Sequence, residues 1–323
     1  GMRVYYRVEA GEPAAADSAA LACGGTAWWC HALAGYAAQG GGDAERADSA
    51  FDAALREMPE SVRCAWSDIH TLLPGDMRGR YEELPCSARD AVERRYWMLG
   101  RPRLAAPVNG WRVEFLARQV QGWLAERSLT PQGLGWGDDA SELLLRYGWP
   151  VRWSRVQRST ASLTPDVGII GHDPWPSFAF GPREEILDSL AASGDDGWEL
   201  YARQSESRYA PRGVRRMAPV GAQIARFRRG DSTLVTAAFR LSDDSVRAPI
   251  AQLAATLDDG RTFASPPDSV TAGVATLLLP ERPRLAGVEI ADSAAGTLAR
   301  ARVLYPPAIA SAGLSLSRQM PGS

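Results

Sequence analysis

Residues 27–59, AWWCHALAGYAAQGGGDAERADSAFDAALREMP, decide the fold of the first part of the chain. Small and apolar residues recur there at three- and four-residue intervals in two blocks, 27–40 and 43–58, which predicts amphipathic helices. Consecutive glycines end the first block, Asp43 is a good N-cap for the second, and Pro59 ends it. The stretch therefore predicts a helix pair.

The helix pair carries part of the tetratricopeptide-repeat signature. The matching positions are Gly35, Ala47, Phe51, Ala54 and Pro59, whereas His31, Ala34 and Ala38 stand where that repeat has Trp, Leu and Tyr. The segment resembles one such repeat, and the resemblance implies a tetratricopeptide-like α-helical part over 1–108. A single repeat does not bury its own apolar face, so helices predicted at 61–73 and 87–99 would cover it, unless the stretch ends a longer array. The resemblance implies a peptide- or protein-binding groove, and plain packing is the alternative.

The most specific motifs follow a further predicted helix at 110–127. They read Leu134-Gly135-Trp136-Gly137-Asp138-Asp139 and, seven residues later, Tyr147-Gly148-Trp149-Pro150. The two motifs resemble the bacterial GWxTD domain family, with Asp138 in place of Thr and Trp149 in place of the first Pro. The resemblance implies a small mixed α/β middle domain over 109–202 in an exported or envelope-associated protein. It implies no reaction, cofactor or catalytic residue.

Aromatic residues gather around these motifs and form the candidate binding site: Trp136, Tyr147, Trp149 and Trp153. They would bind a carbohydrate or a peptide at a surface, or close a small domain as its core. Asp138 and Asp139 would serve acid–base chemistry or calcium, or cap a helix that begins near Ala140. No third oxygen ligand follows them at EF-hand spacing.

The last hundred residues change to short apolar runs, at roughly the ten-residue spacing typical of an antiparallel β-sandwich. The runs are 223–228, 234–241, 251–257, 274–279, 285–290 and 299–305, separated by turns such as Arg229-Gly230-Asp231 and Asp258-Asp259-Gly260. The pattern predicts a β-sandwich domain over 220–323. Residues 203–219 are rich in Arg, Ser, Pro and Gly and are predicted to be a linker. The chain as a whole is predicted to be an α+β multidomain protein.

The cysteines bear on the compartment. No C-x-x-C is present, and no His or carboxylate lies beside the cysteines at metal spacing, so we expect no zinc site. Among the three possible pairings we favour Cys23 with Cys30 and Cys64 with Cys86, with four buried free thiols as the alternative. Disulfides would place the chain in the periplasm or outside the cell, because the cytosol keeps thiols reduced. The alternative location is the cytoplasm.

Composition excludes several function classes. The 323 residues are 45% hydrophobic and 23% charged, with a net charge of -2. No apolar run reaches about 18 residues, so no transmembrane segment is predicted. The chain lacks the basic excess of a nucleic-acid-binding protein. All 36 basic residues are Arg, which indicates a GC-rich bacterial genome rather than a chemical role.

Candidate catalytic residues are few. His31 and His70 lie on predicted helices, whereas His172 and Asp173 form a turn after a short apolar strand, where active-site loops commonly lie. No nucleophile elbow, phosphate loop, dinucleotide fingerprint or HExxH pair occurs, and we predict no cofactor and no metal. We therefore predict a non-enzymatic, envelope-associated scaffold that binds a protein partner. The alternative is an exported hydrolase-type enzyme with a site near Asp139 and His172.

Overall fold

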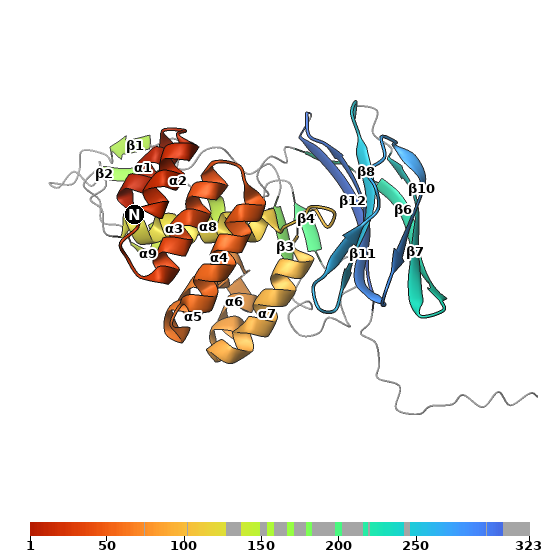
Figure 1. The fold of residues 1–323 in the computed structure, drawn as a ribbon, viewed down its shortest axis with the longest axis horizontal. Helices are drawn as coiled ribbons and strands as arrows, with labels where there is room; N and C mark the ends of the chain where they lie inside the picture. The colour runs from red at the N-terminus through yellow and green to blue at the C-terminus, as the bar shows by residue number, and fades with distance from the viewer. Residues whose placement is uncertain are drawn as a thin grey trace, which may run out of the picture.

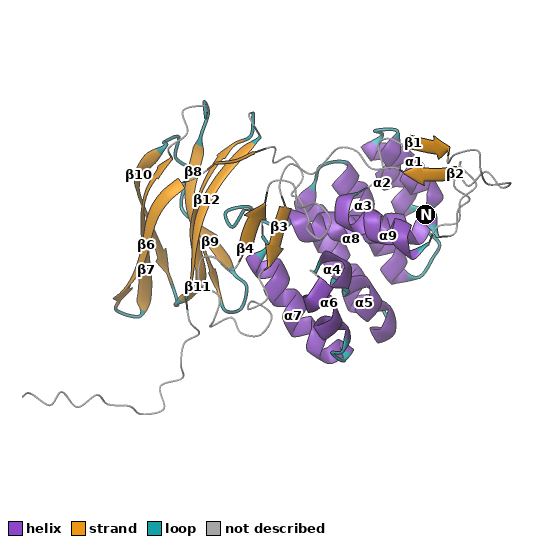
Figure 2. Ribbon diagram, turned by 180° about the vertical axis from the view of Figure 1, so that it is seen from behind, coloured by secondary structure: helices purple, strands orange, loops and turns teal. Residues whose placement is uncertain are grey.

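Helices form the N-terminal part of the molecule and largely antiparallel sheets form the C-terminal part (Figure 1). The computed structural model describes residues 1–73, 75–101, 103–126, 137–148, 154–157, 167–170, 179–182, 198–201, 216–218, 220–241, 246–294 and 296–305. The α+β class is confirmed at this level. Seen from behind, the helices and the strands β6 to β12 lie on opposite sides of the molecule (Figure 2).

The helices and one 3-10 turn are α1 (Met2–Glu9), α2 (Pro13–Leu21), α3 (Ala27–Gly40), α4 (Ala44–Glu57), α5 (Glu60–Ser67), η1 (His70–Leu72), α6 (Gly75–Glu82), α7 (Cys86–Leu99), α8 (Gly110–Ala125) and α9 (Asp138–Tyr147). The predicted helix pair is α3 and α4, and the carboxylate of Asp43 accepts the N–H of Arg46 at 3.1 Å as its N-cap. Gly35 lets the two helices approach, because a Cβ there would lie 2.7 Å from the Phe51 ring.

The helix predicted over 61–73 is interrupted. α5 ends at Ser67 because Asp68 takes an extended conformation, and its carboxylate accepts the N–H of His70 at 2.8 Å. The chain then makes the short turn η1 before α6. An Asp that bonds to the backbone two residues ahead competes with the helix in this way.

A single apolar core runs through the helical part. Its largest fully buried side chains are Trp66, Trp111, Tyr81, Tyr96, Phe51 and Phe115. Asn109 is the N-cap of α8, and its side chain accepts two backbone N–H groups; α8 packs against α3 and α4. The helical core therefore includes α8, which follows residue 108.

Two disulfides lie in the helical part. Cys23 and Cys30 join the end of α2 to α3 with a Cα–Cα distance of 5.5 Å. Cys64 and Cys86 join α5 to α7 with a Cα–Cα distance of 5.9 Å. The predicted pairing is confirmed.

Two sheets form the C-terminal part. One has the strand order β10 (Ala272–Leu279), β7 (Ser232–Leu241), β6 (Val220–Arg229), and the other has β5 (Arg216–Ala218), β12 (Thr297–Leu304), β11 (Pro283–Asp292), β8 (Ile250–Leu257), β9 (Thr262–Ala264). Neighbouring strands are antiparallel except β5 and β12. Gly230 and Gly260 have positive φ in the predicted turns. Two smaller antiparallel pairs precede these sheets, β1 (Ser154–Gln157) with β2 (Val167–Ile170) and β3 (Ala179–Pro182) with β4 (Trp198–Tyr201).

Part of the predicted linker forms a strand. Residues 216–218 of the predicted stretch 203–219 form β5, which pairs in parallel with β12. Ala218 is buried in the core that the two large sheets share. The pairing satisfies backbone groups at the edge of β12, and this long-range contact leaves no signature in a stretch rich in Arg, Ser, Pro and Gly.

The two large sheets face each other across one core. Side chains that are fully buried between them include Val235 and Ala237 of β7, Leu253 of β8 and Val288 of β11. β11 is buried along its whole length, although only one of its faces points into this core. The connection between α7 and α8 covers its other face. There Leu104 is fully buried and packs with Leu99, Ala254 and Leu285.

Polar contacts also join the segment between α7 and α8 to β11 and β12. We call the residues that form this contact the joint: Leu99, Leu104, Ala105, Glu289 and Arg302. The N–H groups of Leu104 and Ala105 donate to the two carboxylate oxygens of Glu289 at 2.6 and 3.2 Å. Arg302 donates to Glu289 at 3.0 Å and to the carbonyl of Leu99 at 2.9 Å. Since Glu289 is 1% exposed, these bonds form in a dry environment that makes them costly to break.

Candidate functional site

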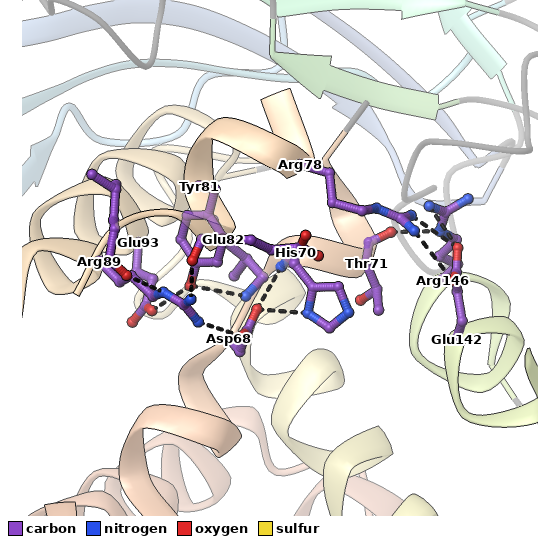
Figure 3. A network of polar contacts seen from close by, with 12 residues as sticks. Asp68, His70, Thr71, Arg78, Tyr81, Glu82, Arg89, Glu93, Glu142 and Arg146 are labelled. Carbon is purple, nitrogen blue, oxygen red and sulfur yellow. Dashed lines mark hydrogen bonds and ion pairs between the residues drawn. The ribbon is translucent and has the colours of Figure 1, made fainter. Parts of the chain in front are cut away.

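A polar network links the helices around Asp68 (Figure 3). One carboxylate oxygen of Asp68 lies 2.7 Å from Nδ1 of His70, and the other accepts a hydrogen bond from Arg89 at 2.8 Å. Burial opposes ionisation of Asp68, but the hydrogen bonds from His70 and the charges of His70 and Arg89 lower its pKa below the ordinary value. Asp68 is therefore a carboxylate that holds an imidazole and a guanidinium in place.

Arg89 is fixed on several sides. Its Nε donates to the carbonyl of Leu84 at 2.9 Å, and its second terminal nitrogen donates to the carbonyl of Glu82 at 2.8 Å. The guanidinium carbon lies 4.9 Å from the centre of the Tyr81 ring, a cation–π distance. These contacts tie the start of α7 to the end of α6.

Tyr81 carries the network into the core. Its hydroxyl donates to Oε1 of Glu93 at 2.7 Å, and Glu93 is only 6% exposed. Burial raises the pKa of Glu93 to about 7, and the hydrogen bond from Tyr81 offsets part of that rise. Glu93 thus titrates near neutrality.

A second ion-pair group joins α9 to the same region. Glu142 accepts hydrogen bonds from Arg78 at 2.9 Å and forms an ion pair with Arg146 at 2.7 Å. Arg146 also donates to the carbonyl of Thr71. Partial burial works against ionisation, yet the hydrogen bond from Arg78 and the two positive charges lower the pKa of Glu142. α9 is therefore held against η1 and α6.

Within the described residues, the network contains an oriented imidazole, which a catalytic site could use, but no nucleophile that is hydrogen-bonded to it. A carboxylate that orients a half-exposed imidazole is the geometry of an oriented general base. In the described part of the chain, however, no Ser, Thr or Cys side chain forms a hydrogen bond with His70. Cys64 and Cys86 line the open hollow of about 540 Å³ beside Asp68, but both are in a disulfide. The contacts of the network join the end of α5, α6 and α7 to one another.

Comparison with known proteins adds no relative. No family model, curated protein or solved structure matches the chain. The resemblances to the tetratricopeptide repeat and to the GWxTD family therefore stay predictions.

The most unusual surface is the face of the three-stranded sheet that points away from the shared core. We call it the outer face: Gly221, Gln223, Ala225, Phe227, Arg229, Ser232, Leu234, Thr236, Ala238, Arg240, Ala272, Val274, Thr276 and Leu278. Phe227 is 56% exposed, Leu278 57% and Val274 70%. The register places Phe227, Leu234 and Leu278 side by side in one row across the three strands. Large exposed apolar side chains gathered on one face of a sheet indicate an interaction surface.

The charges of the outer face have one sign. Arg229 and Arg240 are its charged residues, and it contains no Asp or Glu. Arg240 shares a row with Gly221 and Ala272, at the opposite end of the face from Phe227. The face therefore offers apolar contact together with guanidinium groups, which favours a partner that brings carboxylates.

Most of the sequence-predicted site residues cannot be placed. Trp136, Trp149, Trp153, His172 and Asp173 lie outside the described residues, as does the side chain of Tyr147, the last residue of α9. Asp139 is exposed in the first turn of α9. The helix begins at Asp138 with Gly137 as its N-cap, so Asp138 and Asp139 stand inside it and do not cap it.

The described residues also bear on metal binding and on membrane insertion. They contain no group of three or more His, Cys, Asp or Glu side chains that could hold a metal ion. None of the described helices is both long enough and apolar enough to cross a membrane.

Sequence reasoning missed the Asp68–His70 pair, whose signal is the Asp-x-His spacing at the end of a predicted helix. It also missed the outer face, whose signal is a run at 274–278 that is apolar on both sides of the strand.

Proposed function

We propose that this protein is a non-enzymatic scaffold of an oxidising, exported compartment, the periplasm or the cell exterior, and that it binds a protein partner through the outer face. The observation that carries the proposal is the row formed by Phe227, Leu234 and Leu278, in which Phe227 and Leu278 are exposed. Burying such side chains releases about 25 cal/mol for each Å² of apolar surface. The two disulfides support the compartment, because they persist where thiols are oxidised.

We also propose an identity for three parts of the chain. The paired large sheets are a β-sandwich, the helix pair α3 and α4 is a tetratricopeptide-like repeat, and residues 109–202 include a GWxTD-like domain. The joint supports a scaffold role, since it couples the helical part to the sheets through Glu289 and Leu104. A partner on the outer face would then be held at a fixed distance from the helices. We propose peripheral association with the envelope through that partner.

Partner capture with matched variants tests this function. The tagged full chain is used to capture a protein from an extract of the source bacterium, the partner is identified, and binding is repeated with both proteins purified. Phe227→Asp combined with Leu278→Asp should weaken binding at least about tenfold, because both anchors of the row are lost and charge is introduced. Leu21→Asp is the control, since Leu21 is 88% exposed on α2, far from the row in sequence. Equal binding by the double variant and the wild type would refute the proposal.

Histidine variants distinguish the scaffold from the hydrolase alternative. The enzyme alternative places its site near Asp139 and His172, so His172→Ala would abolish turnover and leave the outer face intact. A scaffold that acts through the outer face keeps its partner in His172→Ala and in His70→Ala. Loss of the partner in either His variant, with binding retained by the Phe227→Asp and Leu278→Asp double variant, would contradict the scaffold.

A further inference from the structure

We propose that the partner joins the three-stranded sheet as an extra strand, antiparallel to β10, and that it is an extended apolar segment with a carboxylate near its C-terminal end. This inference rests on the proposed function and specifies how the surface is used. It starts from the edge of β10, not from the face alone. An edge strand offers a row of backbone N–H and C=O groups to an incoming segment.

β10 has one open edge. In the described part of the chain it pairs only with β7, in a register that runs from Ala272 opposite Arg240 to Leu279 opposite Thr233. β9 directly precedes β10 in the chain but belongs to the other large sheet, where it pairs with β8 and not with β10. Eight residues at about 3.3 Å each give an edge of roughly 27 Å, long enough for a full strand.

The edges of the two large sheets differ in how they resist pairing. β5 and β9 are three residues long, which leaves little to pair with. β6 carries Arg226, Arg228 and Arg229. β10 has neither protection, because no charged residue occurs between Asp268 and Glu281 and the first proline after Pro267 is Pro280. Natural edge strands are normally shortened, charged or interrupted by proline, so a long uncharged edge indicates a strand that is meant to be paired.

The rows of the outer face define the residues that the segment should carry. An added strand would place one side chain beside Leu278, one beside Thr276 and one beside Val274. Apolar residues beside Leu278 and Val274 would cover side chains that are 57% and 70% exposed. A carboxylate beside Ala272 would lie in the row of Arg240, one strand further in. In the antiparallel direction, that carboxylate is at the C-terminal end of the segment.

A second copy of this chain fits the same edge less well. Two β10 strands would pair without bringing any carboxylate to Arg240, because β10 contains none. Face-to-face contact of two outer faces would juxtapose arginines of like charge. The observations therefore favour a different, acidic and apolar segment.

The test uses a peptide as the probe and the full chain as the receptor. The parent peptide is acetyl-Ser-Val-Ala-Thr-Ala-Val-Ser-Asp-amide, which places Val beside Leu278 and Val274 and Asp beside Ala272. Two control peptides carry the same side chains, with alternate backbone amides N-methylated in one set or in the other. Because only one set of amides faces β10, one control should bind at least about tenfold more weakly and the other should bind like the parent. Equal binding by all three peptides would overturn strand addition.

Protein variants test the same assignment from the receptor side. Val274→Lys should weaken peptide binding at least about tenfold, and Leu21→Lys should leave it unchanged. Arg240→Gln should weaken binding of the Asp peptide but not of the peptide that ends in Asn. An unchanged thermal transition confirms that each variant is folded. Loss of binding in Leu21→Lys, or full binding in Val274→Lys, would refute the assignment of β10.

The two proposals can fail separately. If no peptide binds but the Phe227→Asp and Leu278→Asp double variant still loses the captured partner, the outer face binds by another mode and the edge inference falls alone. If the double variant keeps the partner, the proposed function falls whatever the peptide does. A concentration-dependent dimer in sedimentation that Val274→Lys abolishes would assign the edge to a second copy and overturn the inference.

Discussion

At the residue scale, Glu93 makes stability depend on pH near neutrality. Its pKa of about 7 in the folded protein exceeds the ordinary value of 4.5, so the native state keeps a proton that the unfolded chain loses. The stabilisation is complete below about pH 4.5 and is lost as pH rises through 7. Glu93→Gln should remove this dependence, because the amide oxygen still accepts the hydrogen bond of Tyr81.

The expected result is a thermal midpoint at pH 8 that is higher in Glu93→Gln than in the wild type. Each kcal/mol gained corresponds to about 2–4 °C in a domain of this size. At pH 5 the two midpoints should nearly coincide. No measurement is made below pH 5, because Asp68 has a lowered pKa and its stabilisation is lost in acid, with the opposite sign. Exposed Glu83→Gln serves as the control, and a shift there equal to that of Glu93→Gln would contradict the argument.

At the scale of elements, the Cys64–Cys86 disulfide holds α5 to α7. The pair closes a separation of 22 residues, against 7 for Cys23–Cys30. Replacing Cys64 and Cys86 by Ser should cost about 3 kcal/mol, and replacing the other pair about 2 kcal/mol, on loop-closure grounds. Urea unfolding followed by tryptophan fluorescence measures both losses, since no Trp occurs after Trp198. A larger loss from the shorter loop would contradict this ranking.

The elements also show how far sequence alone leads. α3, α4 and the strands β6, β7, β8, β10, β11 and β12 could be predicted because periodicity, caps and turn residues are local properties of the chain, whereas the three-residue strand β9 was missed. The contact between Leu104 and Glu289 could not, since 185 residues separate them. Glu289 interrupts the apolar run at 285–290, but nothing in the sequence near it indicates that its carboxylate accepts hydrogen bonds from Leu104 and Ala105. The network of Asp68, Arg89 and Tyr81 could not be predicted either, because its contacts form only when side chains of α6 and α7 meet.

At the scale of the whole molecule, the joint decides whether the helices and the sheets unfold together. Gly287 permits this contact, because a Cβ there would lie 2.9 Å from Cγ of Arg302 and 3.2 Å from a methyl carbon of Leu104. Gly287→Ala should therefore push Leu104 out of its site, at a cost of about 1–3 kcal/mol for overpacking. Gly221→Ala is the matched control, because its nearest neighbour would be 3.8 Å away.

Unfolding of the wild type should give one transition, with tryptophan fluorescence of the helical part and circular dichroism of the strands changing together. In Gly287→Ala the two signals should separate, because the helical core and the core between the sheets no longer share Leu104. Small-angle scattering should then report a larger radius of gyration for the variant than for Gly221→Ala. Coincident transitions in Gly287→Ala would mean that the polar bonds of Glu289 alone couple the two parts. The scaffold would in that case owe its rigidity to the buried carboxylate rather than to apolar packing.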